Sequence, residues 1–413
     1  MNFPQRKRRL ANTRITKRNF YNFGGSSAFT EEEKNVTSFL PTDEEREFFE
    51  VAKGFALEKI RPIAREAEDN RLVSHNMVKE LEELGFLSLE LPEEWEGLEL
   101  PLISQAQILQ ALSYGDLAVI QGLPGAGDAA SLIRLRKAHP ILSLHKEELI
   151  QSNKTIAVLD LLEVANSQVT IEKTENGWMI DGVSQPIRLA GLADYVVVAA
   201  KDNEGVPVVL WVDIHQDQVK VDSGDYRLGL LASGIGKFIF DQVQISKQLA
   251  LAEAEDAIKL LADMRNRIRV LQAAKQVGLM EAALDYATEY TAGRKAFGQE
   301  IAKFQGVSFR IADMAMETRI ATHLVWEAAL AVEEGRNTAA GSSLRALYRA
   351  HRSLRFVTDS AVQLLGGHGY VQEYPVEKWM RDAQAQVTLY GRERELLIQR
   401  GEQILSGAIG VTV

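Results

Sequence analysis

The chain has 413 residues, of which 46% are hydrophobic and 25% charged, a composition typical of soluble globular proteins with a large core. It contains no cysteine, which excludes disulfides, thiolate zinc sites, iron–sulfur clusters and a cysteine nucleophile. The formal charge of −10 argues against nonspecific nucleic-acid binding by the body of the chain. No apolar run reaches the ~20 residues of a membrane-spanning helix. Any redox chemistry therefore requires a bound cofactor.

The charge is unevenly distributed along the chain. Seven basic residues and no acidic residue precede Glu31, so this arm carries +7, whereas the remaining 40 basic and 57 acidic residues sum to −17. We expect residues 1–40 to form a disordered, solubilising arm. The alternatives are a transit peptide, a contact with nucleic acid or anionic lipid, and a docking segment for an acidic partner. The expected location is the cytoplasm, or the mitochondrial matrix if the arm is a eukaryotic transit peptide.

The section after the arm is predicted to be helical. Thr42 and Glu45 have the spacing of a capping box, which marks the start of a helix. A second amphipathic run ends at Gly85, and further helical patterning covers residues 103–150. We therefore expect an N-terminal helical domain over residues 41–151.

The rest of the chain changes period twice. Short β-rich runs between turn formers predict a small antiparallel β-barrel or sandwich domain over residues 152–250. Helical patterning then returns and predicts a C-terminal four-helix bundle over residues 251–413. The fold class is thus α+β in three parts. The β-rich runs are 155–159, 169–171, 178–180, 195–199, 208–212 and 238–245, and the helical runs are 268–287, 300–334, 340–365 and 385–406.

Motifs for several other chemistries are missing. The seven histidines are scattered without the His-Glu-x-x-His spacing, and no Gly-x-Ser-x-Gly occurs, so neither a metal site nor a serine hydrolase is predicted. The glycine-rich run 122–127 lacks the preceding strand and the Lys-Ser/Thr ending of a phosphate loop. We interpret this run as a break between helices.

Two segments near the C-terminus combine residue types that hold nucleotide cofactors. In the first, a guanidinium, an aromatic ring and an amide lie at a corner between predicted helices, where they could hold a pyrophosphate and cover a flat ring. The second is a glycine cluster that lets backbone amides approach a phosphate or a ribose. The first segment holds Arg294, Phe297 and Gln305, and the second holds Gln363, Gly366 and Gly367.

Together these segments resemble those of acyl-CoA dehydrogenases, flavoproteins that oxidise the Cα–Cβ bond of acyl-CoA thioesters and pass electrons to electron transfer flavoprotein. The resemblance covers residues ~42–408 and implies the same order of helical domain, β domain and bundle. A Gly24-Gly25 pair before the first helix is most similar to the very-long-chain branch. The implied cofactor is FAD, either shared with a partner subunit or lost. The implied partners are an acyl-CoA thioester, a second subunit of the same family in a homo- or hetero-oligomer, and electron transfer flavoprotein if the complex is active.

The resemblance assigns site residues position by position. The six residues of the two segments match family residues that reach across a subunit interface to the adenosine-pyrophosphate half of the neighbour's FAD. Arg269 matches an arginine near the substrate and the catalytic base. It is assigned to the substrate pocket together with Arg188 and Tyr390, which lie in segments that match the flavin- and base-bearing segments of the family.

The family residues that act within one subunit are largely replaced. The Thr-Glu-Pro loop that contacts flavin and thioester aligns with the apolar stretch 158–162, and the tryptophan segment beside the isoalloxazine aligns with 186–190. The two positions that carry the catalytic glutamate hold Tyr390 and Ile268. A phenol with an ordinary pKa near ~10 is mostly protonated at pH 7 and is a poor base for removing a proton next to a carbonyl. No catalytic residue is therefore assigned.

Three functions are compatible with this pattern. In the first, the chain is a subunit that shares an FAD site within an acyl-CoA-oxidising complex and has lost its own base. In the second, it is a homo-oligomeric FAD enzyme whose chemistry on acyl-CoA thioesters needs no base. In the third, it is a non-enzymatic assembly scaffold that binds a partner through the basic arm.

Overall fold

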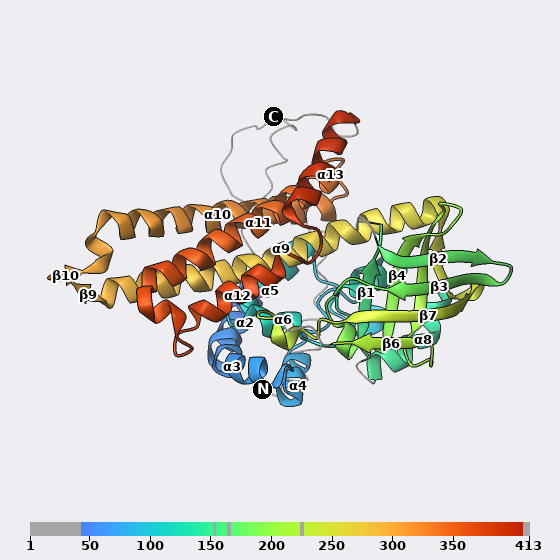
Figure 1. Cartoon of the computed structure of the whole chain (residues 1–413), viewed down its shortest axis with the longest axis horizontal. Coiled ribbons are helices and arrows are strands. Elements are labelled where there is room, and N and C mark those ends of the chain that lie inside the picture. Colours follow the sequence, from blue (N-terminus) through green and yellow to red (C-terminus); the bar gives the residue numbers. More distant parts are fainter. Residues whose placement is uncertain (1–42, 152–153, 163–166, 224–226, 408–413) are drawn as a thin grey trace, which may run out of the picture.

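The computed structural model describes residues 43–151, 154–162, 167–223 and 227–407. Helices from the first part of the chain lie against a long helical bundle, and two β-sheets lie at one end of the molecule (Figure 1). The basic arm, the Gly24-Gly25 pair and Thr42 of the predicted capping box lie outside the described residues. None of the helices within these residues is both long and apolar enough to cross a membrane.

The N-terminal part is helical, as the patterning predicts. Ser74 accepts a hydrogen bond from the amide of Met77 at the start of α4, and Gly85 follows the end of this helix with φ +81°, a conformation that glycine adopts without steric cost. Gly122 ends α6 where a Cβ would lie 2.0 Å from the carbonyl oxygen of Ala232, so the predicted helix break also allows a close backbone crossing. The helices are α2 (Asp43–Phe55), the π-helical turn η2 (Ala56–Ile60), α3 (Arg61–Asn70), α4 (His75–Glu83), α5 (Leu102–Ser113), α6 (Leu117–Gln121), α7 (Ala129–Leu135) and α8 (Pro140–Gln151).

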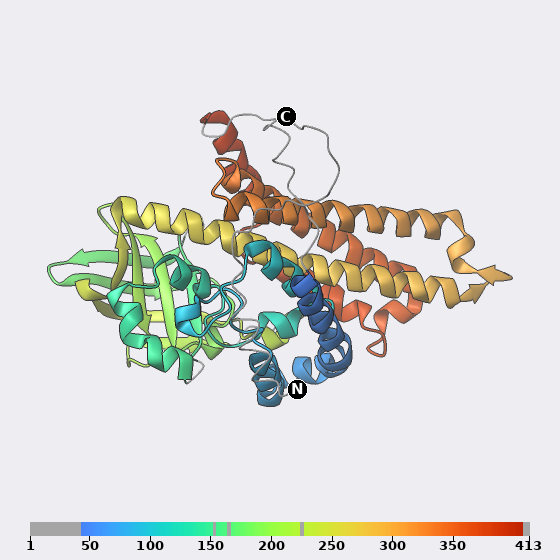
Figure 2. The same cartoon turned by 180° about the vertical axis from the view of Figure 1, so that it is seen from behind.

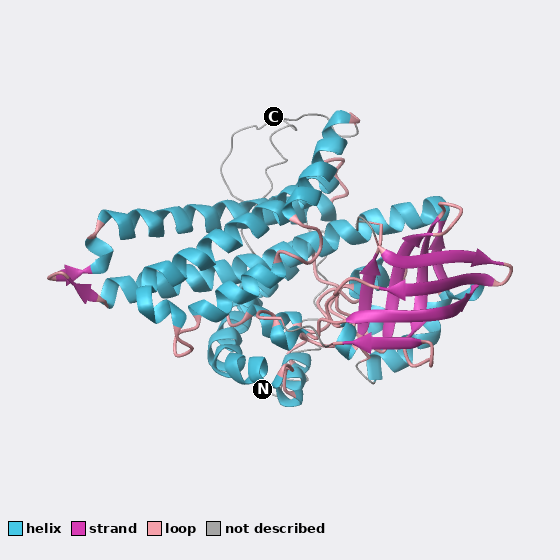
Figure 3. Ribbon diagram, in the orientation of Figure 1, coloured by secondary structure: helices cyan, strands magenta, loops and turns pink. Residues whose placement is uncertain are grey.

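The described strands form two four-stranded sheets, with no closed barrel, and a separate two-stranded hairpin of β9 (Lys295–Ala296) and β10 (Gln299–Glu300) (Figure 3). The predicted class, with a β domain between two helical parts, is confirmed. One pair differs from the antiparallel prediction, because β1 pairs with β4 in parallel, with Ile156 opposite Tyr195. The short strands β6 and β8 and the hairpin β9–β10 were not predicted, because two to four residues carry little periodicity. The first sheet contains β1 (Ile156–Asp160), β4 (Tyr195–Lys201), β5 (Pro207–Asp213) and β8 (Ala250–Glu253), and the second contains β2 (Gln168–Thr174), β3 (Gly177–Val183), β7 (Lys237–Ser246) and β6 (Val219–Asp222).

Strand β4 explains how the sheets stack. Val196 and Val198 belong to the apolar cluster shared by the two sheets, whereas Tyr195 and Val197 belong to a cluster that the first sheet shares with helices. Successive side chains of a strand point to opposite faces, so the first sheet is covered by the second sheet on one face and by helices on the other. The apolar run of β4 follows from burial on both faces.

The bundle is built on one long helix. Helix α9 (Ala254–Gly293) has 40 residues, which corresponds to about 60 Å, and it runs from the sheets to the far end of the bundle (Figures 1 and 2). The single helix predicted at 385–406 is wrong, because the chain leaves helical geometry between α12 and α13, where Tyr390 has φ 61° and Gly391 has φ 94°. The other helices are α10 (Gln305–Glu333), α11 (Ala339–Leu365), α12 (Val376–Gln386) and α13 (Glu393–Leu405).

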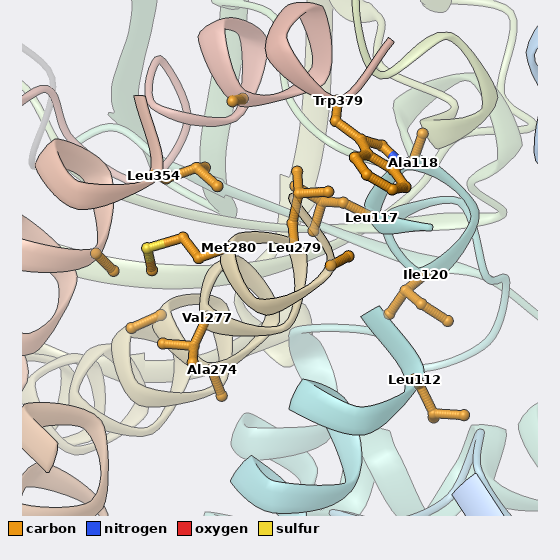
Figure 4. Close-up of a cluster of buried hydrophobic side chains, with 14 of the residues drawn as sticks. Leu112, Leu117, Ala118, Ile120, Ala274, Val277, Leu279, Met280, Leu354 and Trp379 are labelled. Atoms are coloured by element: carbon orange, nitrogen blue, oxygen red, sulfur yellow. The ribbon is translucent and has the colours of Figure 1, made fainter. Parts of the chain in front are cut away.

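The N-terminal helices and the bundle share one apolar core. Leu112 of α5 and Leu117 of α6 pack in the same cluster as Val277 of α9, Leu354 of α11 and Trp379 of α12 (Figure 4). Burial of each large apolar side chain contributes about 1.5–3 kcal/mol. The helical part and the bundle are therefore expected to unfold together.

Candidate functional site

The buried side chain of Arg188 and the partly buried side chains of Asp128 and Tyr390 meet where the helical part, the sheets and the bundle join. Tyr390 donates its hydroxyl to Asp128 Oδ2 over 2.6 Å. Arg188 forms an ion pair with Asp128 Oδ1 at 3.1 Å, and its Nε donates to the hydroxyl of Tyr390 over 3.0 Å. Arg188 and Tyr390, which the resemblance assigns to one pocket, are thus in direct contact, and a carboxylate that the sequence analysis missed joins them.

Amide side chains extend this arrangement toward the bundle. Gln272 donates to Asp128 Oδ1 over 2.9 Å. Gln121 donates to Gln272 Oε1 over 2.6 Å and to Gln386 Oε1 over 2.8 Å, and Lys275 donates to Gln121 Oε1 over 3.1 Å. We call these seven residues the central network: Gln121, Asp128, Arg188, Gln272, Lys275, Gln386 and Tyr390.

The glycine-rich run before α7 brings Asp128 to this position. The carbonyl of Gly125 accepts the amide hydrogen of Ile156, and its amide donates to the hydroxyl of Thr155, so the run is held against the start of β1. Gly127 has φ 51°, and a Cβ there would lie 2.9 Å from the Arg188 guanidinium. An acidic residue directly after the run was the one sequence signal for Asp128, whereas single polar residues on apolar helices gave no signal for the glutamines and Lys275.

Burial and charge shift the pKa values of three members of the central network. Burial would raise the pKa of Asp128, but the charges of Arg188 and Lys275 and the hydrogen bonds from Tyr390 and Gln272 outweigh it and lower this pKa. Burial and the charge of Asp128 raise the pKa of Tyr390 well above its ordinary value. Burial and the charge of Arg188 lower the pKa of Lys275 to about 7, against the opposing effect of Asp128. At neutral pH, Asp128 is therefore ionised and Tyr390 is protonated.

Neither of the two positions that the resemblance matches to a catalytic glutamate carries a carboxylate. Ile268 is buried in the apolar cluster that contains Met264 and Trp95, and Tyr390 packs against the same cluster. An efficient general base has a pKa near the working pH, which excludes Tyr390 because its pKa is raised. The same criterion argues against Asp128 as a base, because the pKa of this neighbouring carboxylate is lowered.

Two further sequence-predicted elements contact helices. Arg269 is buried on α9 and donates to Gln399 Oε1 of α13 over 2.9 Å. In the segment 158–162, Asp160 accepts two hydrogen bonds from the Arg265 guanidinium, at 2.6 and 2.7 Å. The stretch that aligns with the thioester loop is thus bound to α9.

The six predicted cofactor residues are exposed. Arg294, Phe297 and Gln305 lie around the hairpin of β9 (Lys295–Ala296) and β10 (Gln299–Glu300), which projects beyond the long helices (Figure 1). The ring of Phe297 is 95% exposed. Gln363, Gly366 and Gly367 are also exposed, at the end of α11 and the start of the 3-10 segment η8 (Gly366–Tyr370).

One pocket lies apart from the predicted site residues, and it is small. A pocket of about 100 Å³ is lined by residues that include Leu91, Trp95, Ile133 and Ile156 and by none of the predicted site residues. Pockets for drug-sized ligands measure about 300–1,000 Å³. No group of three metal-ligating side chains occurs in the part of the chain that the structure describes.

The two groups of residues differ in how well they fit FAD. The exposed group offers a guanidinium, two amides, glycine backbone and a ring on one open end of the bundle, which suits a pyrophosphate and an adenosine. The central network does not fit a flavin ring, because Arg188 is only 7% exposed and its guanidinium is already bonded to Asp128, Tyr390 and the carbonyl of Gln121.

Comparisons with known proteins identify relatives of the whole fold. The family model "Acyl-CoA dehydrogenase, N-terminal domain" matches residues 42–134, and "Acyl-CoA dehydrogenase, C-terminal domain" matches 258–403. The mitochondrial short-chain specific acyl-CoA dehydrogenase of Sus scrofa is 28% identical over 352 residues, which are 81% of this chain and 83% of the relative. An acyl-CoA dehydrogenase of Bacillus subtilis is 26% identical over 360 residues, or 83% of this chain and 93% of the relative.

Solved structures agree with these matches. Butyryl-CoA dehydrogenase from Megasphaera elsdenii has a TM-score of 0.79 at 25% identity, covering 89% of this chain and 100% of that one. A glutaryl-coenzyme A dehydrogenase in complex with glutaryl-CoA has a TM-score of 0.80 at 24% identity, covering 90% and 97%. At 24% identity, the match to the glutaryl-coenzyme A dehydrogenase shows a common fold and nothing further.

Proposed function

Because the chain belongs to the acyl-CoA dehydrogenase family, we propose that it is a subunit of an acyl-CoA-oxidising flavoprotein complex that shares an FAD site with a partner and has no catalytic base of its own. When bound in such a complex, FAD would supply the hydride acceptor for oxidation of the acyl-CoA thioester. This subunit contributes cofactor contacts and leaves proton abstraction to its partner.

The contrast between the two groups of residues carries the proposal. The six residues expected to contact a neighbour's FAD are all present and exposed, with the Phe297 ring 95% exposed. Two of the positions expected to hold flavin or substrate within the subunit, Arg188 and Tyr390, instead belong to the central network, in which Tyr390 and Arg188 bind Asp128 at 2.6 and 3.1 Å. One half of a shared site is available, and the other half is filled with side chains.

Because the central network occupies the middle of this subunit, the partner has to supply the part of the site that this subunit lacks. In a homodimer, each exposed group would meet a copy whose own centre contains the central network. A partner that supplies the flavin cradle, the thioester loop and the glutamate would complete the site. We therefore propose a paralogue of the same family as the partner, with electron transfer flavoprotein as electron acceptor.

Each exposed residue type has a defined task at such an interface. The guanidinium of Arg294 suits two parallel hydrogen bonds to a pyrophosphate, because its donors are fixed in a fork. The amides of Gln305 and Gln363 can hydrogen-bond ribose or phosphate oxygens. The absent side chains of Gly366 and Gly367 permit close approach to the backbone, and nothing lies within 4 Å of a Cβ at either residue.

The test is co-purification of the chain with a glutamate-bearing paralogue, followed by an FAD titration of the complex. Arg294→Ala should weaken FAD binding by about ten- to a hundredfold, because a hydrogen bond to a charged group is lost. Arg336→Ala is the matched control, because this exposed arginine lies after the opposite end of α10 and pairs with Glu334. The control should bind FAD like the unchanged complex.

Two results would contradict the proposal. A complex that binds FAD equally well with Arg294→Ala and with Arg336→Ala would show that the exposed group does not contact the cofactor. Turnover of acyl-CoA by the chain alone, with FAD and no paralogue, would show that the centre of this subunit is catalytic.

A further inference from the structure

Three aromatic side chains connect the exposed segment that holds Arg294 with the exposed segment that holds Gly366 and Gly367. The hydroxyl of Tyr290 lies 2.7 Å from His368 Nδ1. The His368 ring stacks on Tyr374, with centroids 4.8 Å apart and planes 9° apart. The ring of Tyr290 meets His368 and Tyr374 edge-on, at 5.8 and 6.1 Å. We call Tyr290, His368 and Tyr374 the aromatic clamp.

The aromatic clamp links residues far apart in the sequence. Tyr290 lies on the last turn of α9, and its carbonyl accepts the amide hydrogen of Arg294 over 2.9 Å. The carbonyl of Arg294 in turn accepts the amide hydrogen of Ile301, which closes the corner around the hairpin. His368 belongs to η8, directly after Gly366 and Gly367. The Tyr290–His368 contact therefore connects the segment that holds Arg294 with the segment that holds the two glycines.

The fold of η8 separates an inner side from an outer side. A Cβ at Gly369 would lie 2.3 Å from the carbonyl oxygen of Val362, whereas a Cβ at Gly366 or Gly367 would meet nothing within 4 Å. η8 is thus packed tightly onto α11 at Gly369, with Gly366 and Gly367 open to solvent. The backbone around Tyr374 is also held in place, because Arg65 Nη2 donates to the carbonyl oxygens of Gln372 and Tyr374 over 3.1 Å.

We propose that Tyr290 and His368 are positioning residues that hold Arg294 and the Gly366–Gly367 backbone at the separation required to grip one adenosine-pyrophosphate group. This inference rests on the proposed function, since the ligand is the FAD of the partner subunit. The aromatic clamp itself does not contact the cofactor. It acts by keeping two exposed segments of different helices in register before the cofactor binds, which lowers the cost of ordering them.

The experiment uses the complex with the glutamate-bearing paralogue and measures FAD affinity by flavin fluorescence together with the thermal midpoint. Tyr290→Phe removes the hydroxyl and keeps the ring. It should weaken FAD binding about three- to tenfold, the value of one hydrogen bond, with a thermal midpoint close to that of the unchanged complex. His368→Gln, which keeps a polar partner for Tyr290, should retain more affinity than His368→Leu.

The control and the overturning results separate this inference from the proposed function. Tyr286→Phe removes a hydroxyl one helical turn earlier, where the ring packs edge-on against Trp379 at 5.7 Å, and it should leave FAD affinity unchanged. If Arg294→Ala weakens binding but Tyr290→Phe and His368→Leu do not, the proposed function stands and the aromatic clamp has no positioning role. If the unchanged complex binds no FAD, both are overturned. Equal losses for His368→Gln and His368→Leu would also contradict the polar contact as the cause.

Discussion

Tyr390 donates a 2.6 Å hydrogen bond to Asp128, so the residue at the expected position of the catalytic base holds its proton against an ionised carboxylate. This contact joins the segment before α13 to the turn before α7. In the function proposed above, Tyr390 stabilises this packing and takes no part in proton abstraction.

Restoring a glutamate at this position should not restore a base. Tyr390→Glu would bury a second carboxylate beside Asp128, and like charges in a low-dielectric site are unfavourable. We expect a loss of about 3–5 kcal/mol in the free energy of unfolding and no acyl-CoA oxidation by the isolated chain. Tyr390→Phe, the control, should lose only about 1.5–3 kcal/mol for one hydrogen bond to a charged group, because Arg188 and Gln272 still bond Asp128. Urea denaturation and dye reduction with acyl-CoA test both, and oxidation by Tyr390→Glu would contradict this view of the site.

The Arg188–Asp128 ion pair should show strong coupling in a double-mutant cycle. Only 6% and 13% of their side-chain surface is exposed, so removing one partner leaves a charge that is poorly compensated by solvent. Arg188→Met and Asp128→Asn should each cost about 3–5 kcal/mol. The double variant should lose at least about 1 kcal/mol less than the sum. Additive losses in urea denaturation would mean that the two groups do not depend on one another.

Lys275 should make stability depend on pH above neutrality. Its pKa is about 7 in the folded chain against an ordinary value of 10.5, so between these values the unfolded chain binds more protons than the folded one. Stability therefore rises by a few kcal/mol as pH increases from 7 to 10.5, and the full cost of burying the charge remains below pH 7.

The variant Lys275→Met removes this contribution. Its free energy of unfolding, measured in urea at pH 7, 8, 9 and 10, should rise less steeply with pH than that of the parent. Lys259→Met is the control, because Lys259 is an exposed lysine of the same helix, and it should keep the slope of the parent. Identical slopes for Lys275→Met and the parent would contradict the prediction, because a group other than Lys275 would then cause the pH dependence of stability.

Two glycines of η8 should respond differently to alanine. Gly369→Ala would put a Cβ 2.3 Å from a backbone carbonyl, whereas Gly367→Ala would meet nothing within 4 Å. We expect Gly369→Ala to lose about 2 kcal/mol or more of stability and Gly367→Ala to change it by less than about 0.5 kcal/mol. Thermal and urea denaturation distinguish them. A destabilised Gly367→Ala with an unaffected Gly369→Ala would contradict the described packing of η8.

The long helices could be predicted from the sequence because their periodicity extends over many turns. The helix predicted at 300–334 corresponds to α10 (Gln305–Glu333), and that predicted at 340–365 corresponds to α11 (Ala339–Leu365). The break before α13 was missed because it depends on positive φ angles at Tyr390 and Gly391, and residues such as Tyr rarely adopt them. The parallel pairing of β1 and β4 was missed because pairing is not local in sequence.

The candidate site was predicted unevenly for the same physical reason. Arg294, Gln305 and Gln363 lie in short motifs that are recognisable in one segment, and their role at a subunit interface remains a prediction. The central network joins Gln121, Asp128 and Gln272, which are far apart in the sequence and show no common spacing. Only the packing of α6, α7 and α9 around one point brings these side chains together.

The flavin content of the purified chain, alone and in complex with a glutamate-bearing paralogue, tests the central claim most directly. FAD released by denaturation would be measured by absorbance and divided by the amount of each chain. The account predicts no stoichiometric FAD in the chain alone and one FAD per pair in the complex. One FAD per chain in a homo-oligomer of this protein would contradict it, because the central network would then have to make way for the flavin.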